Sequence, residues 1–130
     1  MLEQLADNMA TDGVGTVGTN IFIGIMPNSP DACLAIYEFA GEGPMEAFSD
    51  GGVSIDVPSI QVMSRGVRMD YPTARTLIVN ARNSLTSVTN ETIGGVRFLR
   101  VREMSAINSL GPDVNDRPIF TVSLQAVVER

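Results

Sequence analysis

The residue types that could do chemistry in this chain of 130 residues are carboxylates, arginines and one thiol. There is no histidine, which removes the commonest general base and metal ligand. The one cysteine, Cys33, excludes an internal disulfide and a cysteine-rich zinc site. Because Cys33 lies in an apolar run and has no base to activate it, we interpret it as a buried structural thiol. We therefore expect no enzyme, no cofactor and no metal.

Three short motifs resemble ligand sites, and a turn explains each of them better. The G-x-G-x-x-G match at residues 13–18 follows an expected helix and precedes an expected strand, the reverse of the order that a dinucleotide site needs. Glu38, Glu42 and Glu46 lie in or beside a glycine-rich segment, where spacing fixes no geometry. Residues 113–116 resemble part of a calcium loop but lack its following glycine and distal glutamate. We interpret these residues as turns and solvated charge.

The charged residues are divided unevenly along the chain. All nine basic residues are arginines, and none of them precedes Arg65. The segment 1–58 therefore carries about −9, because it contains nine carboxylates and no basic residue: Glu3, Asp7, Asp12, Asp31, Glu38, Glu42, Glu46, Asp50 and Asp56. If the two ends of the fold face opposite ways, identical copies attract one another head to tail, which builds rings or filaments.

The spacing of apolar residues predicts an α+β fold. Helices are expected over residues 2–11 and 71–85. Strands are expected at five segments: 20–26, 33–39, 58–66, 96–102 and 118–128. The first two strands should form a hairpin, and the order predicts a mainly antiparallel sheet of four to five strands with both helices packed on one face.

The expected connections are rich in glycine and turn residues. Residues 40–57 combine glycine and acid with little periodicity, so we predict a long loop there. Residues 89–95 and 106–117 are interpreted as turn-rich links. Together these elements predict a single domain over residues 1–130. No apolar run approaches the length of a membrane span, and no signal peptide is visible at the start, so we expect no membrane partner.

The arginines are the side chains most suited to a binding role. Arg97, Arg100 and Arg102 lie on one expected strand, and their planar guanidinium groups engage carboxylates in a fixed direction. The candidate subunit or tube interface comprises these eight residues: Arg65, Arg68, Arg97, Arg100, Arg102, Glu42, Glu46 and Asp50. A solvated strand face remains an alternative. Nucleic-acid binding is a third interpretation, which the net charge of −6 and the lack of interleaved aromatics disfavour.

Five segments, taken in their order and spacing, resemble one known family. They are 18–27 (GTNIFIGIMP), 31–41 (DACLAIYEFAG), 58–66 (PSIQVMSRG), 95–99 (GVRFL) and 115–122 (NDRPIFTV). Together they are similar to phage minor capsid proteins of the tail-terminator, or tail-completion, type. The resemblance implies a small, non-enzymatic α+β subunit that assembles into a ring, typically of six copies, in a long-tailed phage. It further implies that the ring caps the tail tube at full length and provides the surface for head-tail joining.

That resemblance also implies partners and a location. The partners would be further copies of this chain, the tail tube protein and a head-tail connector or head-completion protein, with DNA passing through the lumen without specific binding. The location would be the head-proximal end of the virion tail, after assembly in the host cytoplasm. We expect the arginines to meet acids of the next copy and the acidic surplus to line the lumen. Two other functions remain open: a head-completion or connector protein, and a small monomeric adaptor.

Overall fold

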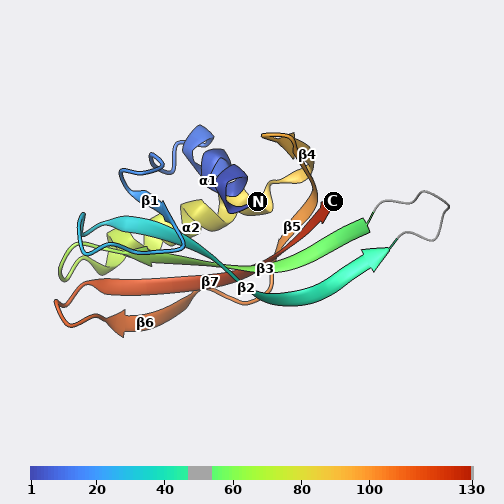
Figure 1. Ribbon diagram of the computed structural model, residues 1–130. Coiled ribbons are helices and arrows are strands. Elements are labelled where there is room, and N and C mark those ends of the chain that lie inside the picture. The colour runs from blue at the N-terminus through green and yellow to red at the C-terminus, as the bar shows by residue number, and fades with distance from the viewer. Residues whose placement is uncertain (47–53, 130) are drawn as a thin grey trace.

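The structure, a computed structural model, describes residues 1–46 and 54–129. Within these ranges seven strands form one sheet, and two helices form a layer against it (Figure 1). In chain order the elements are α1 Leu2–Thr11, β1 Ile21–Ile23, β2 Cys33–Glu46, β3 Ser54–Arg65, α2 Tyr71–Thr86, β4 Thr89–Ile93, β5 Val96–Glu103, β6 Asn108–Pro112 and β7 Pro118–Glu129. The strands lie in the order β1-β2-β3-β7-β5-β4, and β6 pairs with β7.

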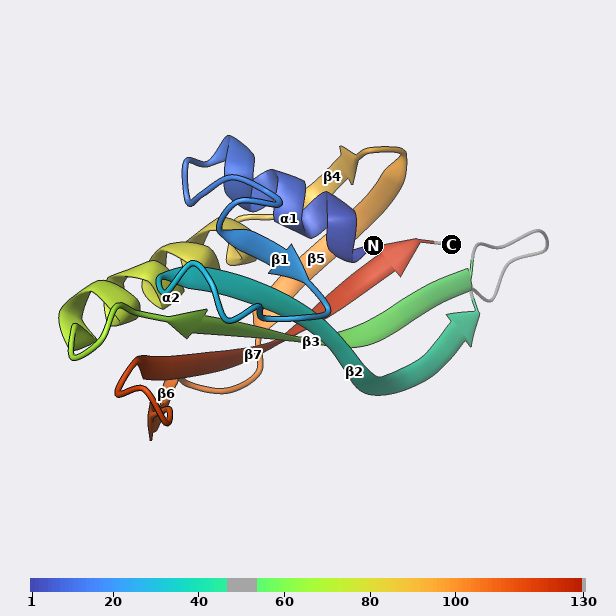
Figure 2. The same cartoon turned by 60° about the vertical axis from the view of Figure 1, so that its left-hand side comes forward.

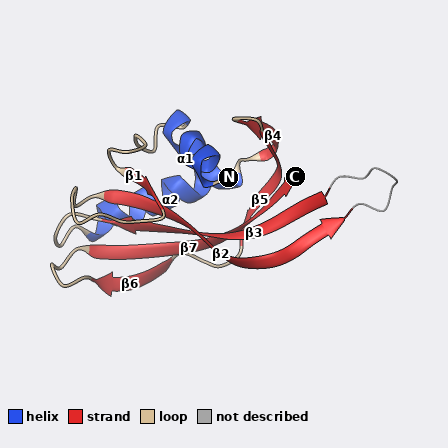
Figure 3. Cartoon of the chain, in the orientation of Figure 1, coloured by secondary structure: helices blue, strands red, loops and turns tan. Residues whose placement is uncertain are grey.

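Both helices lie on the same face of the curled sheet (Figures 2 and 3), as the sequence predicts. Apolar side chains of α1 and α2 share one core with the alternate residues of the central strands. On β7 the five apolar residues predicted to share one face are all buried, and Thr121 and Gln125 of the other face are buried as well: Phe120, Val122, Leu124, Ala126 and Val128 form the apolar set. Burying side chains of this size stabilises the fold by about 1.5–3 kcal/mol each. Neither helix is both long and apolar enough for a membrane span within the described ranges.

Helix α2 forms where its sequence predicts, and its amino terminus is capped. The Asp70 carboxylate accepts a hydrogen bond from the Thr73 amide at 3.3 Å, and Pro72 occupies the first turn, where its missing N–H is not needed. The buried stripe of the helix comprises Ala74, Ile78, Ala81, Ser84 and Leu85. This stripe fixes α2 across β3, β5 and β7, at the centre of the molecule.

The α+β class is confirmed, but the predicted sheet of four to five strands is too small. The two additional strands, β4 and β6, come from segments interpreted above as turn-rich links. Gly94 and Gly95 have φ values of 54° and 81° and join Ile93 to its partner Val96, which is a two-residue hairpin turn. Both extra strands are almost entirely exposed, so neither shows the alternation that identifies a half-buried strand.

The predicted hairpin of the first two strands is wrong, because β1 pairs with β2 in parallel. Ile21, Phe22 and Ile23 stand opposite Leu34, Ala35 and Ile36. The segment 24–32 therefore returns along the sheet and does not make a tight turn. This pairing makes the sheet mixed, whereas its other ladders are antiparallel.

The long loop predicted over residues 40–57 is mostly strand. β2 continues to Glu46 and β3 begins at Ser54, so only 47–53 lie outside the described residues. Two irregularities interrupt the β2–β3 ladder, between Phe39 and Glu42 and between Glu42 and Met45. A bulge places an extra residue on one strand of a pair, so the register of β2 against β3 changes twice in this acidic segment.

Candidate functional site

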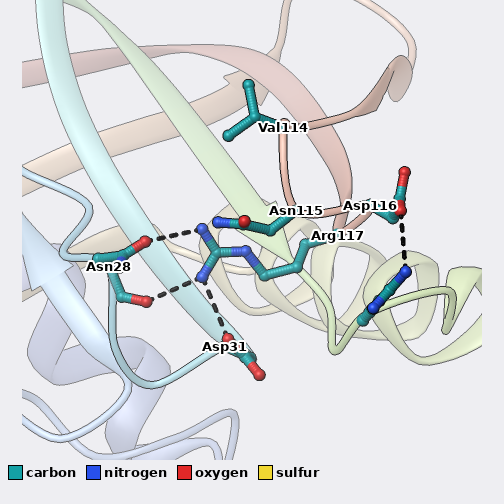
Figure 4. Close-up of a pocket in the computed structure, with 7 residues that line it drawn as sticks. Asn28, Asp31, Val114, Asn115, Asp116 and Arg117 are labelled. Atoms are coloured by element: carbon teal, nitrogen blue, oxygen red, sulfur yellow. Dashed lines mark hydrogen bonds and ion pairs between the residues drawn. The ribbon is translucent and has the colours of Figure 1, made fainter.

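A polar pocket surrounds Arg117, at the end of the sheet where β7 begins (Figure 4). The guanidinium is only 7% exposed. It donates to the Asp113 carboxylate at 2.8 Å, to the Asp31 carboxylate at 3.1 Å, and to the Asn28 backbone and side-chain oxygens at 2.8 and 2.9 Å. Arg117 therefore ties the turn before β7 to the segment that precedes β2.

Hydrogen bonds keep both Asp113 and Arg117 in their charged forms. Partial burial raises the pKa of Asp113. Hydrogen bonds from the backbone N–H and guanidinium of Arg117 and from the N–H of Asn115 lower it by more, so the pKa of Asp113 lies below its ordinary value. The hydrogen bond to Asp113 in turn raises the pKa of Arg117. Both groups remain charged over the physiological pH range, so the cluster has no group poised to exchange a proton.

A second buried arginine, Arg65 at the end of β3, braces the same segment. It is 4% exposed and donates to the backbone carbonyls of Asp31, Pro27 and Pro30 at 2.9, 2.6 and 2.7 Å. Two strands thus hold residues 27–31 through two guanidinium groups. We name this arrangement, Arg65 and Arg117 with residues 27–31, the arginine brace.

The arginine brace fits a structural role better than a catalytic one. Its charged donors are already engaged by carbonyls and carboxylates of the same chain. Among the described residues, no group of three or more acidic or cysteine side chains could hold a metal. Cys33 lies beside the brace and is buried, as predicted, and desolvation raises the pKa of its thiol. A thiol held in its protonated form is a poor nucleophile.

The other predicted interface arginines are exposed on two separate parts of the fold. Arg68, on the turn before α2, contacts Asp116 at 3.4 Å. Arg97, Arg100 and Arg102 all lie on β5. We name these last three residues the β5 arginine row.

The partners of the β5 arginine row differ. Arg97 forms an ion pair with Glu129 at 3.0 Å, and Arg102 donates to the Gln125 side chain at 2.9 Å. Arg100 is exposed, and no carboxylate of residues 1–39 or 55–129, whose side chains the structure describes, lies within ion-pair distance of it. This row offers a guanidinium group that intramolecular contacts leave available.

The predicted acidic interface residues lie towards the opposite edge of the sheet from the β5 arginine row. Glu42 and Glu46 are on β2, separated from β5 by β3 and β7. Asp50 lies outside the described residues. The structure therefore places the candidate set in three regions, and it buries Arg65, which we leave out of the interface proposed below. Sequence reasoning missed Arg117 as a structural residue; its i, i+4 spacing from Asp113 in a turn is the signal that could have found it.

Comparison with known proteins complements this geometry. Residues 9–130 match the model of a family described as bacteriophage tail terminator protein. A search of the curated proteins found no match. Among solved structures, a chain of the virion of a native gene transfer agent particle is similar with a TM-score of 0.65 and 10% identity, covering 100% of this chain and 95% of that chain. A second solved chain gives a TM-score of 0.51 and 16% identity, covering 98% and 89%. At such identities the two likenesses support the fold alone.

Proposed function

This chain belongs to the bacteriophage tail terminator family, and we propose that it forms the ring that caps a completed tail tube. The family is one of virion structural proteins and is not enzymatic, so the chain has a structural role in a phage tail. The observation that carries the finer proposal is the family match, which extends over residues 9–130. A terminator has to stop tube growth and leave a surface to which the head can attach.

The distribution of charge supports assembly through head-to-tail contacts. The exposed β5 arginine row lies across the sheet from β2, which carries Glu42 and Glu46. In our proposal the row of one copy meets acids of the next copy, in a ring of six. A contact between different surfaces of identical copies is heterologous and closes into a ring when its rotation allows.

The proposal also assigns partners and a position. One rim of the ring binds the tail tube protein, and the other binds a head-tail connector or head-completion protein, at the head-proximal end of the tail. The protein assembles in the host cytoplasm as a single domain. DNA passes through the lumen without specific binding, because the acidic surplus of the first 58 residues repels phosphates.

Electron microscopy of the purified protein mixed with tail tubes of its phage tests the proposal. We expect extra density at one end of each tube, with the symmetry of a closed ring. Mixing with DNA-filled heads that lack tails is the matched control. If the protein decorates heads and leaves tube ends bare, it is a connector or head-completion protein. If it remains monomeric with both partners, the adaptor function replaces the ring.

A further inference from the structure

Two strands of the sheet have outer edges that are unpaired within the described residues. β1 covers β2 only from Leu34 to Ile36, so the outer edge of β2 is open from Glu38 to its end at Glu46. On the opposite side, β4 is the last strand and pairs only with β5. Open edges offer backbone donors and acceptors to another chain. Pro44 supplies no N–H, so within residues 42–46 the donors come from the other four residues.

The two open edges lie at the same level of the sheet. Across five adjacent strands, one row of paired residues runs through Thr92, Arg97, Glu129, Ile55 and Met45. The row begins on β4, crosses β5, β7 and β3, and ends on β2. Residues 42–46 and residues 89–93 therefore border the same half of the sheet from its two sides, and Figure 1 shows both at the end that carries the chain termini.

The outer edges of β2 and β4 differ in nearby charge, and this difference favours pairing β2 with β4 over pairing β2 with another β2. The charged residues of β2 are Glu38, Glu42 and Glu46, so two β2 edges placed together would bring like charges near one another. β4, in contrast, lies next to β5 and its arginine row. Neighbouring strands are about 4.8 Å apart, so a strand added outside β4 lies within reach of extended arginine side chains two strands away.

We propose that the outer edge of β2, residues 42–46, pairs with β4 of a second copy and continues the sheet from one subunit to the next. This inference rests on the proposed ring and names the segments that join its subunits. β2 and β4 run in the same direction, since four successive antiparallel steps separate them. A rotation about an axis along the strands keeps that direction, so the contact is parallel.

Pairing of these edges suits a closed ring for two physical reasons. It joins different surfaces of identical copies, as a heterologous ring contact requires. It also pairs residues 42–46 of β2 and the outer edge of β4 once the ring has closed, which reduces the template for further edge-to-edge aggregation. β2 then lies two strands from the β5 arginine row of the neighbour, with β4 between them, and the opposite charges of the two segments favour this order of the edges.

Thiol crosslinking between single-cysteine additions tests the contact. The variants are Met45→Cys on β2 and Thr92→Cys on β4, each in the full chain that also carries the buried Cys33. A bismaleimide able to span a register shift of two residues, about 7 Å, is added to each variant alone and to their mixture. The matched control mixes Met45→Cys with Arg75→Cys, whose residue is exposed on α2. All samples are run with and without tail tubes.

The proposed contact predicts a crosslinked dimer in the Met45→Cys and Thr92→Cys mixture, and none in either single variant or in the control. Crosslinking of Met45→Cys with itself would instead indicate a two-fold contact and overturn the inference. Rings visible by electron microscopy without the mixed crosslink would overturn the inference and leave the proposed function intact. Absence of both rings and crosslinks on tail tubes would overturn both.

Discussion

Replacement of Arg65 by methionine should destabilise the protein by removing half of the arginine brace. Methionine fills a similar volume but cannot donate, so three backbone carbonyls of the 27–31 segment lose their partner. These are the carbonyls of Pro27, Pro30 and Asp31, at 2.6–2.9 Å from the guanidinium. Arg65 is buried, so the vacated position is poorly accessible to water.

The magnitude follows from the three hydrogen bonds. A hydrogen bond to a charged group contributes about 1.5–3 kcal/mol when both partners are buried. Residues 28–31 are themselves exposed, so their carbonyls regain water in part, and about 1 kcal/mol per bond is the better value. Arg65→Met should therefore lower the free energy of unfolding by about 3 kcal/mol. Arg65→Lys keeps the charge but not the planar fork, so it should lose about 2 kcal/mol.

Urea unfolding measures this loss, with Arg75→Met as the matched control. Arg75 is exposed on α2, and its replacement should change the free energy of unfolding by less than about 0.5 kcal/mol. With a slope of about 1.5 kcal/mol per molar urea, Arg65→Met should unfold at about 2 M less urea than the control. Equal midpoints for Arg65→Met and Arg75→Met would refute the reasoning that these hydrogen bonds hold the segment.

Three further predictions test packing, assembly and pH dependence. Gly66→Ala should destabilise by about 1–3 kcal/mol in thermal unfolding, because its Cβ would lie 2.8 Å from the Ala74 Cβ; an unchanged melting temperature would contradict that packing. Arg100→Glu should reduce ring formation in light scattering at low salt, whereas Arg75→Glu should not, and equal effects would remove Arg100 from the interface. Because the Asp113 pKa is lowered in the folded state, its stabilisation is complete above the ordinary aspartate pKa of about 3.9 and lost as pH falls further. The stability difference between wild type and Asp113→Asn should therefore shrink in acid, and a constant difference would contradict this.

The elements that the sequence predicts well are those with one buried face. α2 buries a single stripe from Ala74 to Leu85, and β7 buries every second residue towards the helices. Such patterns arise because an amphipathic element must turn one side to the core. β4 is not predicted, because its five residues are almost all exposed and therefore show no alternation of apolar and polar residues.

Topology and the arginine brace depend on contacts that local sequence does not encode. The parallel pairing of β1 with β2 depends on how residues 24–32 are held, and the groups that hold them are far away in sequence. Arg65 contacts this segment across 34–38 positions, and Arg117 across 86–89. An arginine whose donors meet backbone carbonyls has no acidic partner to reveal it, so Arg65 resembled a surface residue until the fold was known.

The arginine brace alters what the uneven charge distribution means for assembly. Arg65 is buried against carbonyls, so its charge does not offset the acids on the surface, and the exposed shell is more acidic than the net charge of −6. Copies therefore repel one another in most orientations over about a Debye length, roughly 8 Å at physiological salt. The β5 arginine row is a basic patch on this surface, and Arg100 adds a guanidinium with no described carboxylate within ion-pair distance. In the proposed ring, attraction between this row and acids of the next copy, together with repulsion between acidic surfaces, would favour one orientation of approach.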